Sequence, residues 1–533
     1  MLHSTRKIEA TRQSPSGQRK REMGGSEEAT TRRDRWGYSV RTDSGDCIDA
    51  INAYYEQVLA YGRGRAVILR AVNYDSSCAL ANALAAHFVA TKNPEEASRL
   101  LHAANASFDN ATPYERAVVA AISCLLGDNK DEEMALGRHV GDLVLVFDDG
   151  GKMFLFLADI SLLLSGAMLL KEFPKDLLSL KRVQILCFYL GRPAVSLSIV
   201  QQVLVHNEDR SYIYGMLSFP LLELGRMTEA EGAARKGLSI NSCDIWSQHN
   251  WFDFHVNWSS NCAMFFKMSV VLEKPQVSWM LALPHGIPVH LSCMYTHNWW
   301  HAAVCYLEGD SPLNKVLEIY DENIWKELQR SDAEPVEVYI NALGLLLRIH
   351  LRGHTHDIAE RLKFQATAVK EKSIWHVEWL LDILALWALA CTNERNEAEE
   401  LLDSIKSRFS TLSSQKQQSM RAAIQLAQAI YEYGRGNLVK VFDLLGPDFD
   451  AANFKMIGAS DEQLDVFNEV WYINLLNIGQ VPKAIEVMKK QVCKRQGAPF
   501  LWRMLEKAYS IEGMPDALLA GEKAKTLEAA YFR

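Results

Sequence analysis

The spacing of two glycines constrains the fold of this chain more than any other feature of its sequence. Leu190-Gly191 and Leu224-Gly225 each follow an apolar segment of helical length, and the two glycines are 34 residues apart. A glycine can adopt the left-handed backbone conformation that commonly ends a helix. A recurrence near 34 residues is typical of repeats made from one antiparallel helix pair. The spacing therefore predicts helix pairs joined at glycine corners.

The same period returns near the C-terminus, where Gly479 and Gly513 are again 34 residues apart. Trp502, Leu505 and Tyr509 precede Gly513 with the spacing that the first helix of a tetratricopeptide repeat uses to pack on its partner. Small residues follow in both places, and we expect them to line the second helix of each pair: Ala230, Ala233, Ala234, Ala517, Ala520 and Ala524. We therefore expect an all-α fold, a right-handed α-solenoid of tetratricopeptide-like helix pairs.

Helical spacing also runs through 47–69, and residues 76–90 and 95–106 are expected to form a pair with Pro94 in the first turn of its second helix. A further helix is expected over 113–126. Longer units lie between turn signals in the C-terminal half: 44 residues from Gly309 to Gly353, and 43 both from Asn393 to Gly436 and from Gly436 to Gly479. These units leave room for an extended linker at 446–450.

Two stretches break the rhythm and divide the chain. Residues 141–167 differ in composition from their surroundings, and 249–292 have poor helical periodicity. We expect six segments: a disordered basic arm (1–35), helical repeats (36–140), an atypical apolar insertion (141–167), further repeats (168–248), an irregular segment (249–292) and C-terminal repeats (293–533). The arm is expected to be disordered because it holds nine Lys or Arg, five acidic residues and few large aliphatics.

Bulk properties limit the classes of function. A net charge of −8 gives no reason to expect a nucleic-acid partner. The apolar run 153–170 approaches the length of a membrane span, but Asp159 in its middle makes a span unlikely to be stable. A secretory signal would need an apolar run after the first charges, and none follows, so we expect a cytoplasmic protein. The ten cysteines contain no CxxC pair, which argues against a zinc ribbon.

Two groups of polar residues are candidates for a site. His297 and His301 are four residues apart on one helix face, as two metal ligands would be. His249 is a possible third ligand, and Asp465 or Glu469 a fourth. We expect instead a hydrogen-bonded pair between stacked helices, with no metal and no other cofactor. Asp465, Asn468 and Glu469 predict side-chain partners in a groove, and a solvated helix face is the alternative.

Several phrases of the sequence resemble the plant members of the tetratricopeptide repeat protein 38 family. The most specific are His-Asn-Trp-Trp-His within 294–309 and Asp-Val-Phe-Asn within 457–471, and similar wording occurs in 171–182, 337–348, 424–437, 443–450 and 497–509. The resemblance covers most of 36–140, 168–248 and 293–533. It implies a helical-repeat protein and carries over no enzymatic activity.

The chain departs from that family where the rhythm also fails. The family lacks anything like 141–167. Trp246 and His249 match a W-x-x-H start, but the second histidine that the family has four residues later is replaced by Asp253. Translated non-coding sequence would produce such departures, and we hypothesise that 141–167 and 250–292 are not native repeat structure.

The sequence contains no Gly-rich phosphate loop after a strand and no G-x-S-x-G elbow, so no catalytic residue is predicted. Our first hypothesis is a non-enzymatic scaffold that binds a protein or peptide in the concave groove of the solenoid. The candidate groove residues are His249, His297, Asn298, His301, Asp465, Asn468 and Glu469. The alternatives are a metal-dependent or other enzyme with a His-lined site inside the superhelix, and a scaffold tethered to a membrane through 141–170.

Overall fold

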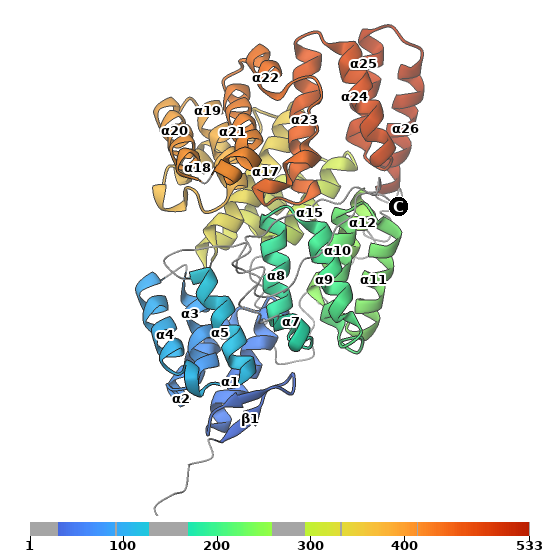
Figure 1. Ribbon diagram of the computed structural model, residues 1–533. Helices are drawn as coiled ribbons and strands as arrows, with labels where there is room; N and C mark the ends of the chain where they lie inside the picture. Colours follow the sequence, from blue (N-terminus) through green and yellow to red (C-terminus); the bar gives the residue numbers. More distant parts are fainter. Residues whose placement is uncertain are drawn as a thin grey trace, which may run out of the picture.

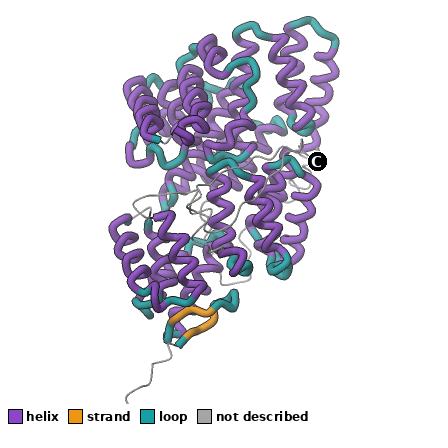
Figure 2. Tube along the Cα trace, viewed as in Figure 1, coloured by secondary structure: helices purple, strands orange, loops and turns teal. Residues whose placement is uncertain are grey.

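The computed structural model describes residues 30–90, 93–126, 169–257, 294–330, 333–412 and 414–531, without the side chains of residues 252–257, 294, 415, 416 and 419. Within these ranges the chain is helical except for one short hairpin, which confirms the predicted all-α class (Figures 1 and 2). No helix in the described part has the length and apolarity needed to cross a bilayer. Residues 1–29, the insertion 141–167 and the part of the irregular segment from 258 to 292 lie outside the described residues.

A two-stranded antiparallel hairpin begins the described chain, with Arg32 of β1 (Thr31–Arg33) opposite Val40 of β2 (Ser39–Arg41). The predicted disordered arm was therefore drawn too long, because its last residues belong to this hairpin. The side chain of Asp34 explains the turn, since one of its oxygens accepts hydrogen bonds from the backbone N–H groups of Trp36 (3.0 Å) and Tyr38 (2.9 Å). These bonds fix a local turn that alternating polarity alone would not predict.

The helices of the N-terminal part follow in order: α1 (Gly45–Leu59), η1 (Gly64–Ala66), α2 (Val67–Tyr74), α3 (Ala79–Val89), α4 (Pro94–Ala106), η2 (Phe108–Asn110) and α5 (Pro113–Leu126). The pair α3 and α4 was predicted, and Asn93 caps α4 by accepting a hydrogen bond from the N–H of Glu96 at 3.1 Å. The predicted helical spacing over 47–69 covers α1, η1 and the start of α2. Tyr61 takes a left-handed φ of 56° and separates α1 from α2.

The next helices are α7 (Leu169–Glu172), α8 (Leu177–Tyr189), α9 (Pro193–Leu204), α10 (Ser211–Glu223), α11 (Met227–Ile240) and α12 (Ile245–Asn257). Gly191 and Gly225 form the predicted corners, with φ of 64° and 71°. At the second corner the N–H of Arg226 donates to the carbonyl of Leu221 (2.9 Å), and that of Gly225 to Leu222 (2.8 Å), which is a Schellman motif. Residues 249–257, predicted as irregular, continue helix α12.

The C-terminal part consists of α15 (Met294–Glu308), α16 (Leu313–Ile319), η5 (Tyr320–Ile324), η6 (Trp325–Gln329), α17 (Pro335–Leu351), α18 (Ala359–Ala368), η7 (Lys372–Ile374), α19 (Trp379–Cys391), α20 (Arg395–Thr411), α21 (Ser414–Gly434), α22 (Leu438–Leu445), η8 (Ala451–Ile457), α23 (Asp461–Asn477), α24 (Val481–Lys494), α25 (Pro499–Ile511) and α26 (Asp516–Tyr531). Its helix pairs turn at left-handed residues: Asp310, Gly353, Asn393, Gly436, Gly479 and Gly513. The first corner is Asp310 and not the expected Gly309. Aspartate tolerates this conformation better than most residues.

Buried side chains form two large hydrophobic clusters. The N-terminal core extends from Trp36 to Met216, and the C-terminal core from Trp300 to Ala520. Consecutive helices pack together along the chain, but distant ones also meet: α8 contacts η8, α15 contacts α26, and α17 contacts α23 (Figure 1). The helix pairs therefore fold back on one another, and the helix α12 lies between the segments that form the two cores.

Candidate functional site

Three histidines meet between the two cores. His249 comes from α12, and His297 and His301 come from successive turns of α15. One ring nitrogen from each lies within 4.8 Å of the other two. The residues are 3%, 9% and 2% exposed, respectively. The structure thus brings His249 to the predicted pair, and we call these three residues the histidine cluster.

The hydrogen bonds of His297 fix which of its nitrogens carries a proton. Its Nδ1 lies 3.0 Å from Oδ1 of Asn341 in α17. The amide nitrogen of Asn341 donates to Oγ1 of Thr296 (3.1 Å) and to the carbonyl of Glu337 (3.0 Å), so Oδ1 must be the acceptor. Nδ1 of His297 therefore donates, and its Nε2 presents a lone pair. That lone pair faces Nε2 of His301 at 3.2 Å, which confirms the predicted hydrogen-bonded pair.

Aromatic rings enclose the histidine cluster on two sides. Trp246 stacks on His249 with centroids 5.5 Å apart, and Trp300 stacks on His297 at 5.4 Å. Burial lowers the pKa of all three imidazoles, and for His249 and His301 the pKa falls well below its usual value. Repulsion from His297 adds to the effect on both. The cluster is therefore neutral at pH 7, with nitrogen lone pairs available as ligands.

The second predicted group lies on α23 and is buried. Asp465, Asn468 and Glu469 are 8%, 5% and 4% exposed, so the solvated-face alternative is wrong. Asp465 pairs with Arg495, and Oδ1 of Asn468 accepts a hydrogen bond from the N–H of Ala451 at 2.9 Å. These side chains hold helices and a loop together, and they present no accessible groove surface. The half-buried Asn298 lies on α15 beside the histidine cluster.

Glu469 belongs to an ion-pair network that the sequence did not reveal. Its Oε1 lies 2.6 Å from Nη1 of Arg348, and its Oε2 lies 2.9 Å from Nη1 of Arg352. Arg352 also pairs with Glu308, whose other oxygen accepts the N–H of Phe500 at 3.1 Å. Arg348 lies in the apolar helix α17, and Arg352, four residues later, is its C-cap residue; this spacing was the available signal. The network joins α15, α17, α23 and α25.

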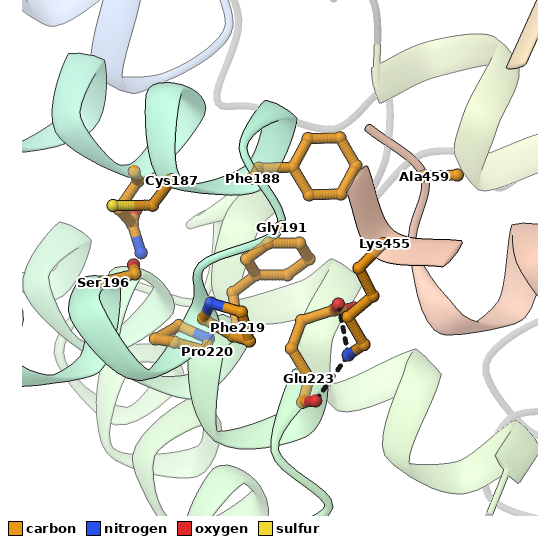
Figure 3. Close-up of a pocket in the computed structure, with 11 residues that line it drawn as sticks. Cys187, Phe188, Gly191, Ser196, Phe219, Pro220, Glu223, Lys455 and Ala459 are labelled. Carbon is orange, nitrogen blue, oxygen red and sulfur yellow. Dashed lines mark hydrogen bonds and ion pairs between the residues drawn. The ribbon is translucent and has the colours of Figure 1, made fainter. Parts of the chain in front are cut away.

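A small pocket lies where the N-terminal and C-terminal parts touch (Figure 3). Nζ of Lys455 in η8 donates to the carbonyl of Glu223 (2.6 Å) and to its carboxylate (2.9 Å). Burial raises the pKa of Glu223 to about 8, and the nearby Asp461 adds to the shift, although Lys455 opposes it. Gly191 is required here, because an added Cβ would lie 3.0 Å from the backbone of Lys455 and Met456. The pocket belongs to a contact between parts of the chain.

Ser404, His376 and Asp382 are hydrogen-bonded in the order Ser–His–Asp, as in the catalytic triad of a serine hydrolase. Nε2 of His376 lies 2.7 Å from Oγ of Ser404, and its Nδ1 lies 3.1 Å from Oδ2 of Asp382. Ser404 is in the middle of α20, where the helix uses the backbone N–H groups that an oxyanion hole would need. The left-handed His376 (φ 63°) instead ties the start of α19 to α20. Sequence reasoning missed this contact because its three residues follow no motif.

No family model matches the chain. The resemblance noted in the sequence therefore stays a prediction, and function must be argued from the residues described above.

Proposed function

We propose that this chain is a non-enzymatic scaffold that binds a protein or peptide partner in the cytoplasm. In this proposal the helix pairs form a right-handed superhelix of the tetratricopeptide type, and the chain belongs with the tetratricopeptide repeat protein 38 family. The observation that supports it is the series of antiparallel pairs joined at left-handed residues, from Gly191 to Gly513. Stacked pairs of this kind present extended surfaces suited to holding another chain.

The partner surface must differ from the one that the sequence predicted. Of the seven predicted groove residues, six are at most 9% exposed, which leaves them unable to contact a partner without opening the fold. Exposed apolar residues are better candidates. Leu518 and Leu519 on the last described helix, α26, are 70% and 68% exposed, and Ile511 on α25 is 54% exposed. Exposed apolar side chains that are close together favour a surface that a partner covers.

The test is affinity capture from an extract of the source cells, with the full chain as bait. The double variant Leu518→Asp, Leu519→Asp should keep the wild-type melting temperature, because both side chains are exposed. The amount of partner that it captures should fall about tenfold or more. The matched control is Lys523→Asp, Lys525→Asp, which changes charge at exposed positions of the same helix. If the leucine variant captures as much partner as the lysine variant does, this surface is not the binding surface. A wild-type bait that captures no specific protein would refute the scaffold proposal.

The enzyme alternative has less support. A substrate would have to reach imidazoles that are 2–9% exposed and lie between stacked tryptophans. The chemistry that such buried nitrogens favour is ligation of an ion.

A further inference from the structure

We propose that the histidine cluster, His249, His297 and His301, binds one divalent transition-metal ion, with Zn²⁺ as the first candidate. Imidazole nitrogen is a ligand suited to zinc, copper, nickel and iron, and three histidines with an open fourth position form a known zinc geometry. This inference is independent of the scaffold proposal, because it concerns the interior and not the partner surface.

The separation of the nitrogens fits a metal ion. Zinc–nitrogen bonds of about 2.0–2.1 Å in a tetrahedron place neighbouring ligand atoms about 3.3–3.4 Å apart. Nε2 of His297 and Nε2 of His301 are already 3.2 Å apart. One ring nitrogen of His249 lies within 4.8 Å of a ring nitrogen of each of the other two, so small ring rotations have to close a gap of at most about 1.4 Å.

The surroundings of His297 are those of a metal ligand. Metal-bound histidines usually donate their second ring N–H to an oxygen that fixes the ring and its tautomer. Nδ1 of His297 makes this bond to Asn341, which Thr296 and Glu337 hold in place. Binding of the ion requires that the proton on Nε2 of His301 move to Nδ1 of the same ring, which frees the Nε2 lone pair. Each imidazole then binds as a neutral donor.

The charges near the histidine cluster are paired with one another. Arg348 lies over Trp300, the ring that stacks on His297, and Arg352 follows one turn later. Glu469 pairs with both arginines, Glu308 pairs with Arg352, and Glu462 accepts a hydrogen bond from Arg348 through its backbone carbonyl. The carboxylates of Glu469 and Glu308 thus balance the two guanidiniums, so these four paired side chains add no net charge beside the site.

The position of the site indicates what the ion does. Trp246 packs on the edge of the N-terminal core, and Trp300 belongs to the C-terminal core. The histidine cluster lies between these two tryptophans and connects α12 to α15. A bound ion would cross-link the two parts of the molecule, so it stabilises the fold.

The experiment uses the full chain, purified without a polyhistidine tag or chelator, and measures metal by mass spectrometry. We expect about one equivalent of zinc per chain in the wild type, and less than about a tenth in His249→Gln and in His301→Gln. The control is His206→Gln, an exposed histidine outside the cluster, which should retain the wild-type content. Stoichiometric zinc in both cluster variants, or none in the wild type, would overturn the proposal.

A second measurement covers the case in which the cluster variants fail to fold. Wild-type protein is stripped with a chelator and reloaded with Zn²⁺ or Co²⁺. Reloading with Zn²⁺ should raise the melting temperature by several degrees, and Co²⁺ should give the visible absorption of a tetrahedral nitrogen site. A melting temperature that does not change on reloading, together with no Co²⁺ absorption, would show that the histidines are simply hydrogen-bonded core residues.

Discussion

Replacing Glu469 by glutamine removes the one charge shared by two buried guanidiniums. The side chain of Glu469 is 5% exposed, and those of Arg348 and Arg352 are 4% and 9% exposed. In Glu469→Gln both arginines stay buried, and a neutral amide remains as their acceptor. Arg352 keeps Glu308, and Arg348 keeps the carbonyl of Glu462. The variant therefore leaves about one uncompensated positive charge in the interior.

Removing one partner of a buried ion pair typically costs about 3–5 kcal/mol. Because both arginines keep another acceptor, we expect Glu469→Gln to lower the free energy of unfolding by about 3 kcal/mol, the lower end of this range. If the C-terminal core unfolds as one unit, this loss lowers its melting temperature by about 5–10 °C. Hydrogen exchange should accelerate in α17 and α23, the helices that the network joins.

Glu486→Gln is the matched control. Glu486 also contacts two cations, Lys483 at 3.1 Å and Lys490 at 2.7 Å, but its side chain is 48% exposed. Exposed pairs of this kind contribute little, so the melting temperature should not change measurably. The assay is differential scanning calorimetry of both variants and the wild type. Equal shifts for Glu469→Gln and Glu486→Gln would refute the argument that burial makes the network strong.

Burial raises the pKa of Asp34 to about 7, so between about pH 4 and 7 the carboxyl is protonated in the native state and ionised in the unfolded state. The free energy of unfolding should therefore fall as the pH rises through this range, by up to about 1.4 kcal/mol per pH unit. Asp34→Asn should flatten this dependence in melting curves, and an unchanged slope would contradict the assignment. Gly191→Ala should lower the free energy of unfolding in urea more than Gly225→Ala does. Both substitutions strain a left-handed corner by about 1–2 kcal/mol, but of the two only Gly191 would place the added Cβ 3.0 Å from backbone atoms. Equal losses would show that the backbone moves to relieve this contact. Ser404 should not react with a fluorophosphonate probe, and labelling that His376→Ala abolishes would show that the serine is activated after all.

Periodicity predicted the helix pairs well because each corner needs a particular backbone conformation. Gly191, Gly225 and Gly513 take the left-handed φ that their spacing indicated, and α5 has the predicted bounds. The misses have local causes. Tyr61 and Asp310 supply left-handed corners without glycine, and the hairpin at Thr31 depends on the side chain of Asp34.

The candidate site was predictable in part. The i, i+4 spacing placed His297 and His301 on one helix face, and His249 was predicted as a possible third member of the group. The role of Asp465, Asn468 and Glu469 was not predictable, because their partners are Arg495, the start of η8 and Arg348, which are distant in sequence or follow no motif. Arg348 lies 121 residues from Glu469 in sequence, and no local pattern connects them. Polar residues within a helical repeat therefore indicate contact, but they do not say whether the contact is with solvent, a partner or the chain itself.

The division of the apolar interior into two clusters bears on how the chain is made. A cluster that extends from Trp36 to Met216 draws all its members from the first part of the sequence. During synthesis, this part can bury its side chains while the remainder is still being translated. The later part then docks on the first through contacts such as that of Lys455 with Glu223. Assembly at the ribosome thus ends with a joining step between two preformed pieces.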